Sequence, residues 1–229
     1  MAILTISERK LKPTVILVSL LFLALSILFF SPVSIPHKVT FPLALLFIAS
    51  LWLLPWQMSM AMLFSALGDY FGSCNNFILQ MSFFAVNHIF MIWFFIQRYF
   101  TKVERDGKLT AKAKGYMTMV FFCAISLLVV TFTNIVPEAD PGIIRTGVSI
   151  YACLICTMMV SALLQRSSLY AIGAVLFVFS DFILAWHKFV EPVPYRRYLV
   201  MVTYYLAQWL LFVRSSPYRI KNQVKLLRF

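Results

Sequence analysis

The sequence predicts an all-α protein that crosses a membrane several times, and three observations support this fold class. Of its 229 residues, 62% are hydrophobic and only 12% are charged, whereas soluble domains average about 25% charged residues. Apolar runs of about 20 residues, long enough to cross a bilayer as helices, recur along the whole chain. Alternating segments of about 10 residues, typical of a transmembrane barrel, do not occur. We therefore expect a single transmembrane domain over residues 1–229.

Eight membrane-spanning helices are predicted, each bounded by turn-forming or charged residues. The segment SPVSIP ends the first helix, and Pro55 separates the second from the third, because proline breaks a continuing helix. The charged loop TKVERDGKLTAKAK follows the fourth helix, and the turn NIVPEADPG follows the fifth. A basic tail follows the eighth. The predicted spans are roughly 13–31, 37–54, 56–72, 76–99, 115–134, 143–164, 168–189 and 195–214.

The distribution of positive charge tests whether the second and third helices are separate. With eight spans, 15 of the 20 Lys and Arg residues lie on the face that holds both termini. With those two helices merged, the division is only 13 to 7. Because Lys and Arg collect in cytoplasmic loops, the sharper division favours eight spans with both termini in the cytoplasm. The same rule accounts for the net charge of +12 without a nucleic-acid partner, and none is expected.

Two aspartates lie inside apolar segments, although the other six acidic residues belong to loops or to the N-terminus. Asp69 and the histidine His88 are the only acidic or basic side chains between Lys38 and Arg98, and Asp181 is set in GAVLFVFSDFILAW. Each aspartate follows the predicted start of its helix by 13 residues, or about 20 Å of helix axis. The two helices run in the same direction, so the sequence predicts both carboxyls at a similar depth, nearer the outer face.

A carboxylate in the hydrocarbon layer is costly, by about 2.5–3.5 kcal/mol on the lenient insertion scale. Such residues normally face the bundle interior or a water-filled cavity. Desolvation and a second nearby carboxylate both favour the neutral form of a carboxyl. We therefore expect one protonated and one ionised carboxyl, an arrangement suited to acid/base hydrolysis. The alternative is that each aspartate only joins helices by hydrogen bonds.

Other polar side chains occur at similar depth and predict one shared polar pocket. Tyr204 and Gln208 are four residues apart, as are Ser65 and Asp69, so the members of each pair share a helix face. Gly68 and Gly72 form a G-x-x-x-G pattern that is typical of close helix packing. The candidate binding residues are Lys38, Ser65, Asn87, His88, Ser180, Tyr204, Tyr205 and Gln208.

The four cysteines do not predict a metal site. Cys153 and Cys156 form a C-x-x-C, but this pair lies within the apolar segment SIYACLICTMMV without a second ligand pair. Structural zinc sites use four such ligands. We interpret these cysteines as packing residues, and we expect neither a metal nor another cofactor.

Several motifs resemble those of the YhhN family, from Lys38 to the end of the eighth helix. They are S-x-x-G-D at Ser65–Asp69, a histidine in the fourth helix, G-A-x-L-F-x-x-S-D at Gly173–Asp181 and Y-Y-x-A-Q at Tyr204–Gln208. Family members often have a tyrosine three residues after that histidine, where this chain has Met91. The resemblance implies eight transmembrane helices in a membrane that we expect to be the bacterial inner membrane.

The resemblance also implies a lysoplasmalogenase, which cleaves the vinyl ether bond of a lysophospholipid to a fatty aldehyde and a glycerophospho-alcohol. Asp69 and Asp181 would then be the catalytic acid/base pair, by analogy with the two carboxyls of glycosidases. His88, Tyr205 and Gln208 would position water or substrate, and Lys38 would contact the phosphate. Two alternatives stay open: a proton-coupled transporter that uses the same aspartates, and a non-catalytic assembly or lipid-binding factor.

Overall fold

Eight α-helices follow one another in the computed structural model, which describes residues 13–106 and 111–226, with side chains over 13–101 and 115–216. No strand occurs in these ranges, so the predicted all-α class is confirmed. A short 3₁₀ helix, η2 (Lys38–Thr40), precedes the second α-helix. The helices are α1 (Pro13–Phe30), α2 (Phe41–Leu53), α3 (Trp56–Ser73), α4 (Phe77–Asp106), α5 (Ala111–Asn134), α6 (Ile143–Leu163), α7 (Ser168–Phe189) and α8 (Arg196–Leu226).

The predicted spans match these helices except at a few ends. Helix α4 continues to Asp106 and α8 to Leu226, because Lys, Arg and Glu are good helix formers and a helix does not stop where its apolar residues stop. The predicted span 37–54 is instead η2 followed by the 13-residue α2, which has Pro42 in its first turn. His37, just before η2, adopts a left-handed conformation with φ 54°, so the chain turns sharply there.

Within the described residues, five helical segments are long and apolar enough to cross a membrane: Pro13–Phe30, Phe77–Thr101, Gly115–Asn134, Ile143–Leu163 and Ser168–Phe189. The segment Lys38–Leu53 is apolar but shorter. These segments identify an integral membrane protein, whereas eight crossings remain a prediction. The terminal residues 1–12 and 227–229 lie outside the described residues, and the cytoplasmic location of both termini also remains a prediction.

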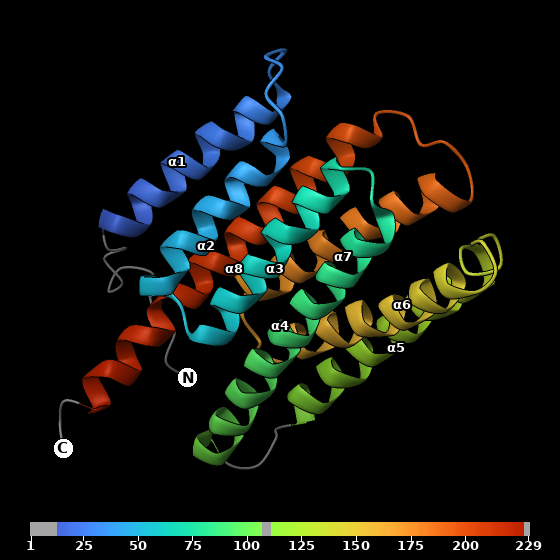
Figure 1. Ribbon diagram of the computed structural model, residues 1–229. Helices are drawn as coiled ribbons and strands as arrows, with labels where there is room; N and C mark the ends of the chain where they lie inside the picture. The colour runs from blue at the N-terminus through green and yellow to red at the C-terminus, as the bar shows by residue number, and fades with distance from the viewer. Residues whose placement is uncertain (1–12, 107–110, 227–229) are drawn as a thin grey trace.

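Consecutive helices run in opposite directions, so that α1 begins and α8 ends at the same end of the bundle (Figure 1). The most extensive contacts join α3 to α4 and α7 to α8. Helix α1 packs on α2 and α8 at one edge of the bundle, and α5 packs on α6 at the other (Figure 1). Helices α3 and α7, which carry the two aspartates, therefore both lie in the interior of the bundle.

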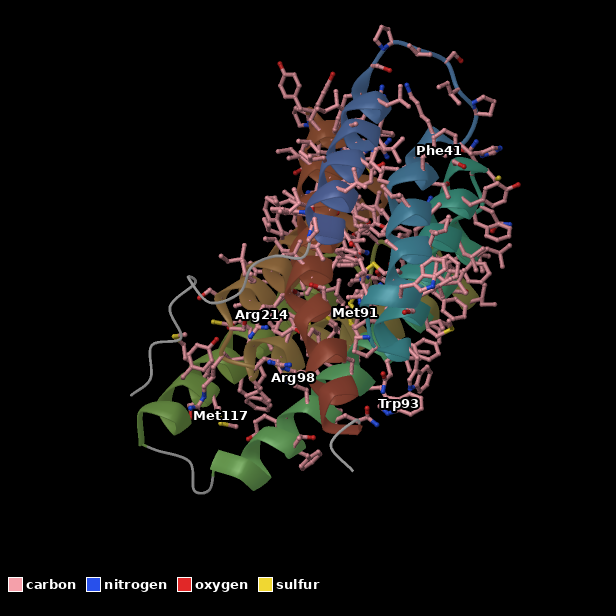
Figure 2. The ribbon with its side chains drawn as sticks, turned by 90° about the vertical axis from the view of Figure 1, so that its left-hand side faces the viewer. Phe41, Met91, Trp93, Arg98, Met117 and Arg214 are labelled. Carbon is pink, nitrogen blue, oxygen red and sulfur yellow. The ribbon has the colours of Figure 1, made fainter. Side chains whose placement is uncertain are left out.

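Two arginines and a tyrosine join three helices at one end of the bundle. The guanidinium carbons of Arg98 (α4) and Arg214 (α8) lie 5.5 Å and 5.3 Å from the ring centroid of Tyr170 (α7). Figure 2 shows both arginines toward one end, far from Phe41, which begins α2 at the other end. Cation–π contacts of this kind stabilise by about 0.5–2 kcal/mol each. The cation–π cluster therefore lies at one end of the bundle, and the aspartates lie toward the other end, which holds Phe41.

The bundle exposes large apolar side chains and buries polar ones, as a membrane interior requires. Leu17, Leu20 and Phe122 are more than half exposed, whereas Asn87 and Gln208 are fully buried. Close helix packing at the predicted G-x-x-x-G is confirmed at Gly68, because a Cβ atom there would lie 2.9 Å from the ring of Phe84 on α4. The polar interior is thus enclosed by tightly packed helices.

Candidate active site

Asp181 is held by side chains from two other helices. The hydroxyl of Tyr151 (α6) donates a hydrogen bond to Oδ2 of Asp181 (α7). Nε2 of His88 (α4) lies 3.1 Å from the Tyr151 hydroxyl oxygen and 3.7 Å from the same Asp181 oxygen. The His88 side chain is fully buried, but 13% of the Asp181 side chain is exposed. This carboxyl therefore faces a space that a ligand can enter.

That space is a partly open cleft of about 60 Å³ between α5, α6 and α7. Among the described residues, Asp181 is the one acidic or basic side chain in its wall, and Tyr151 supplies a hydroxyl beside it. The hydroxyl of Thr131, also in the wall, donates to the carbonyl of Leu127 within α5. The lining residues are Leu127, Thr131, Ile135, Val148, Tyr151, Ala152, Ile155, Cys156, Val178, Asp181, Phe182 and Ala185. An apolar ligand with one reactive polar group suits such a wall.

Asp69 lies in a second, more deeply buried network between α3 and α8. The Tyr204 hydroxyl donates to Asp69 Oδ2 at 3.1 Å, and Nε2 of Gln208 donates to the Ser65 hydroxyl at 2.9 Å. The sequence predicted that the members of each pair share a face of their helix, and the structure shows that these two faces contact each other. Only 4% of Asp69 is exposed, and it does not line the cleft.

The two carboxyl networks meet across one aromatic ring. The ring centroid of Phe177 lies 4.9 Å from that of His88 and 5.5 Å from that of Tyr204. Each carboxyl has its own tyrosine donor, so the aspartates form two linked networks and not one directly hydrogen-bonded pair.

Several buried polar atoms near these networks have no hydrogen-bond partner within the described side chains. They are both amide atoms of Asn87, Nδ1 of His88 and Oε1 of Gln208. Buried polar groups are almost always paired, and ordered water commonly satisfies those that protein atoms do not. These atoms on α4 and α8 therefore mark places where the interior can hold water or a polar part of a ligand.

Three predicted site residues bond to main-chain carbonyls away from the cleft. Nζ of Lys38 donates to the carbonyls of Ser31 and Val33, both at 2.7 Å. The Tyr205 hydroxyl donates to the carbonyl of Val39.

The Ser180 hydroxyl likewise donates to the carbonyl of Val200. None of these three side chains belongs to the cleft wall. The structure thus brings together Asp69, Ser65, Tyr204 and Gln208 in one network and Asp181 with His88 in the other.

Tyr151 was not among the predicted site residues. A tyrosine in an apolar span is a usable signal, since a buried tyrosine hydroxyl normally has a hydrogen-bond partner. In the segment SIYACLICTMMV, only the two cysteines were considered, as possible metal ligands. Among residues 13–106 and 111–226, no group of three or more His, Cys, Asp or Glu side chains could hold a metal ion.

Comparison with known proteins identifies the family. The YhhN family model matches residues 33–215. Lysoplasmalogenase TMEM86B of Sus scrofa is 30% identical over 163 residues, which are 69% of this chain and 63% of that protein. The Rattus norvegicus protein of the same name is 32% identical over 161 residues, or 68% of this chain and 60% of that protein.

A shorter match, 47% identical over 47 residues, is to lysoplasmalogenase TMEM86A of Homo sapiens and covers 20% of each chain. The matched part of this chain thus spans less than two thirds of the length of the pig and rat relatives. No solved structure matches it. Because the family model covers most of the chain, this protein belongs to the YhhN family.

Proposed function

We propose that this protein is a membrane-embedded hydrolase that cleaves the vinyl ether bond of lysoplasmalogens, or of a closely related lysolipid, into a fatty aldehyde and a glycerophospho-alcohol. The observation that carries the proposal is the placement of Asp181 and Tyr151 in the wall of an otherwise largely apolar cleft. The relatives named lysoplasmalogenases support the same chemistry.

The cleft suits a lipid with a single hydrocarbon chain. Its wall extends along α6 from Val148 to Cys156, about 12 Å at the rise of an α-helix. The apolar lining on either side of Tyr151 would contact the hydrocarbon chain and the glycerol carbons. The vinyl ether of such a lipid would then lie beside the Asp181 carboxyl.

The reaction needs an acid and a water molecule. Protonation of the β-carbon of the enol ether gives an oxocarbenium ion, and water adds to its carbon. The resulting hemiacetal then collapses, the C–O bond to glycerol breaks, and the aldehyde and the alcohol are released. General acid catalysis of such a proton transfer typically contributes about 10²–10⁴-fold in rate, and nearby negative charge stabilises the cation.

Asp181 is the carboxyl that a ligand in the cleft would touch, so we assign it as the acid. Tyr151 donates to Oδ2, which leaves Oδ1 to carry the proton that is transferred to carbon. The water that adds to the cation returns a proton to the same carboxylate. An ionised Asp69, supported by the Tyr204 hydroxyl, would stabilise the cation across the Phe177 ring.

The unpartnered amide and imidazole atoms of the interior would hold the water. Asn87 and Gln208 offer amide atoms, and His88 offers Nδ1. Ser65 fixes the Gln208 amide from the opposite helix. In this proposal these residues position water and do not exchange protons with the lipid.

The experiment is aldehyde release from a lysoplasmalogen by purified protein in detergent, measured by mass spectrometry. We expect wild-type turnover and a loss of at least about 100-fold in Asp181→Asn, the range for removal of a general acid. Asp140→Asn, in an exposed turn, is the matched control and should retain activity. Full activity in Asp181→Asn would overturn the assignment. Solute flux in sealed vesicles, without aldehyde release in detergent, would support the transporter instead.

A further inference from the structure

Arg145 lies in the first turn of α6, three residues before Val148, which lines the cleft. Its Nε donates to the carbonyl of Ala139 at 3.1 Å, and its Nη2 donates to the carbonyls of Pro137 and Ala139, both at 2.9 Å. The side chain is thus fixed against the α5–α6 turn, although the residue is exposed. Its Nη1 carries two more N–H donors, for which the described part of the structure gives no hydrogen bond.

The carbonyl that fixes Arg145 belongs to a residue packed against the cleft wall. Ala139 is 1% exposed and packs in one cluster with Ile135 and Val148, which both line the cleft. The Arg145 guanidinium therefore lies just beyond the apolar end of the cleft. Tyr151, next to the Asp181 carboxyl, follows Arg145 by six residues of α6, or about 9 Å of helix axis.

The dimensions of a lysoplasmalogen match this spacing. Seven covalent bonds separate the β-carbon of its vinyl ether from the phosphorus, and an extended chain spans about 3.8 Å per three bonds, which gives about 9 Å. With the vinyl ether at Asp181 and the hydrocarbon chain directed toward Cys156, the phosphate would reach the level of Arg145. We propose that Arg145 binds the phosphate of the lysolipid, an inference that rests on the proposed function.

The chemistry of the two groups fits. A guanidinium offers several N–H donors in a fixed plane and forms charge-assisted hydrogen bonds with phosphate oxygens. Glu138 and Asp140 are exposed in the same turn, but within the described residues neither forms an ion pair with Arg145. The positive charge of Arg145 is therefore available to an anion that approaches from solvent or from the lipid head groups.

Lys38 is the cation that the family resemblance predicted to contact the phosphate. It belongs to η2, which packs against α1, α2 and α3, whereas α5, α6 and α7 form the cleft. Its Nζ already donates to the carbonyls of Ser31 and Val33. A lipid in the cleft would thus have its phosphate beside Arg145 and not beside Lys38.

The test compares two substrates with and without the phosphate: an alkenyl-glycerophosphoethanolamine and the corresponding alkenylglycerol. For Arg145→Gln we expect kcat/KM on the phosphate-bearing lipid to fall by roughly 10- to 100-fold, the range for loss of a charge-assisted hydrogen bond. On the phosphate-free lipid kcat/KM should stay at the wild-type value. Arg145→Lys should recover part of the loss. Lys38→Gln tests the alternative cation. Arg197→Gln is the matched control, because the Nη2 of Arg197 likewise donates to a main-chain carbonyl, that of Phe29, at 2.8 Å. Both variants should keep the wild-type ratio of kcat/KM on the two lipids.

The outcomes separate this inference from the proposed function. Equal losses of kcat/KM on both substrates in Arg145→Gln would show a structural role for Arg145 and overturn the inference. Wild-type kcat/KM on both substrates would overturn it too. So would a selective loss on the phosphate-bearing lipid in Lys38→Gln instead of Arg145→Gln. In each of these cases wild-type hydrolysis would leave the proposed function intact. A wild-type protein that hydrolyses neither lipid would overturn both.

Discussion

The hydroxyl of Tyr151 donates a hydrogen bond to Oδ2 of Asp181, and this contact joins α6 to α7 in the wall of the cleft. His88 approaches the same two groups from α4. Three helices thus fix one carboxyl oxygen and leave the other available to a ligand. The position of the Asp181 carboxyl therefore depends on Tyr151 as well as on its own helix.

The first prediction is that Tyr151→Phe lowers kcat/KM for lysoplasmalogen hydrolysis without unfolding the protein. In the proposed reaction, Asp181 becomes a charged carboxylate as it transfers its proton, and Tyr151 donates to that carboxylate. Losing a hydrogen bond to a charged group costs about 1.5–3 kcal/mol, or roughly 10- to 150-fold in rate. Steady-state kinetics in detergent measures the loss. Tyr198→Phe, at a residue that is 54% exposed, is the control. Wild-type kinetics in Tyr151→Phe would show that this hydroxyl only joins two helices.

The second prediction separates the roles of the two aspartates. Asp69 is buried behind the Phe177 ring and does not line the cleft, so Asp69→Asn should lower kcat while KM stays within a factor of about two, as expected for an interaction made only in the transition state. Saturation kinetics on one lysoplasmalogen provides both constants. An increase in KM with unchanged kcat would instead place Asp69 in contact with bound substrate.

Much of the fold and part of the site could be predicted because both depend on local signals. Trp56 and Ser168 were correctly predicted as the first residues of their helices, so each aspartate lies 13 residues into its helix, as predicted. The face shared by Tyr204 and Gln208 followed from the helical repeat alone. Charged residues within apolar runs are rare, so Asp69 and Asp181 were conspicuous in sequence.

What the sequence did not reveal depends on which helices pack together. Periodicity does not tell which neighbour a helix face contacts, so Tyr151 and Asp181, 30 residues apart, gave no signal as partners. For the same reason the two aspartates looked equivalent, although only Asp181 borders the cleft. The role of Lys38 was implied by the family resemblance, but its partners Ser31 and Val33 belong to a connecting segment with no regular pattern.

The third prediction concerns the cleft as the site of the hydrocarbon chain. Ala185 lines the cleft and is partly exposed, so the larger side chain of Ala185→Phe should fill the space and obstruct a bound lipid. We expect kcat/KM to fall by roughly tenfold or more, consistent with about 1–3 kcal/mol for overpacking. The control is Ala171→Phe, at a partly exposed position of α7 outside the cleft wall. The same kinetic assay compares the two, and equal activities would place the lipid elsewhere.

The fourth prediction is that Gly173→Val destabilises the protein through the α7–α8 interface. A Cβ atom on Gly173 would lie 3.1 Å from Cγ of Leu211 and 3.3 Å from the carbonyl oxygen of Ala207. Because that carbonyl belongs to a helix backbone, α8 has to shift, and overpacking of this kind costs about 1–3 kcal/mol.

The measurement for Gly173→Val is the thermal unfolding midpoint in detergent, followed by circular dichroism. Gly115→Ala is the matched control, because a Cβ atom there meets nothing within 4 Å and alanine stabilises a helix by about 0.5–1 kcal/mol relative to glycine. The midpoint should therefore fall in the first variant and stay level or rise in the second. An unchanged midpoint in Gly173→Val would mean that α7 and α8 can separate without loss of stability, and that this contact does not hold Asp181 in place.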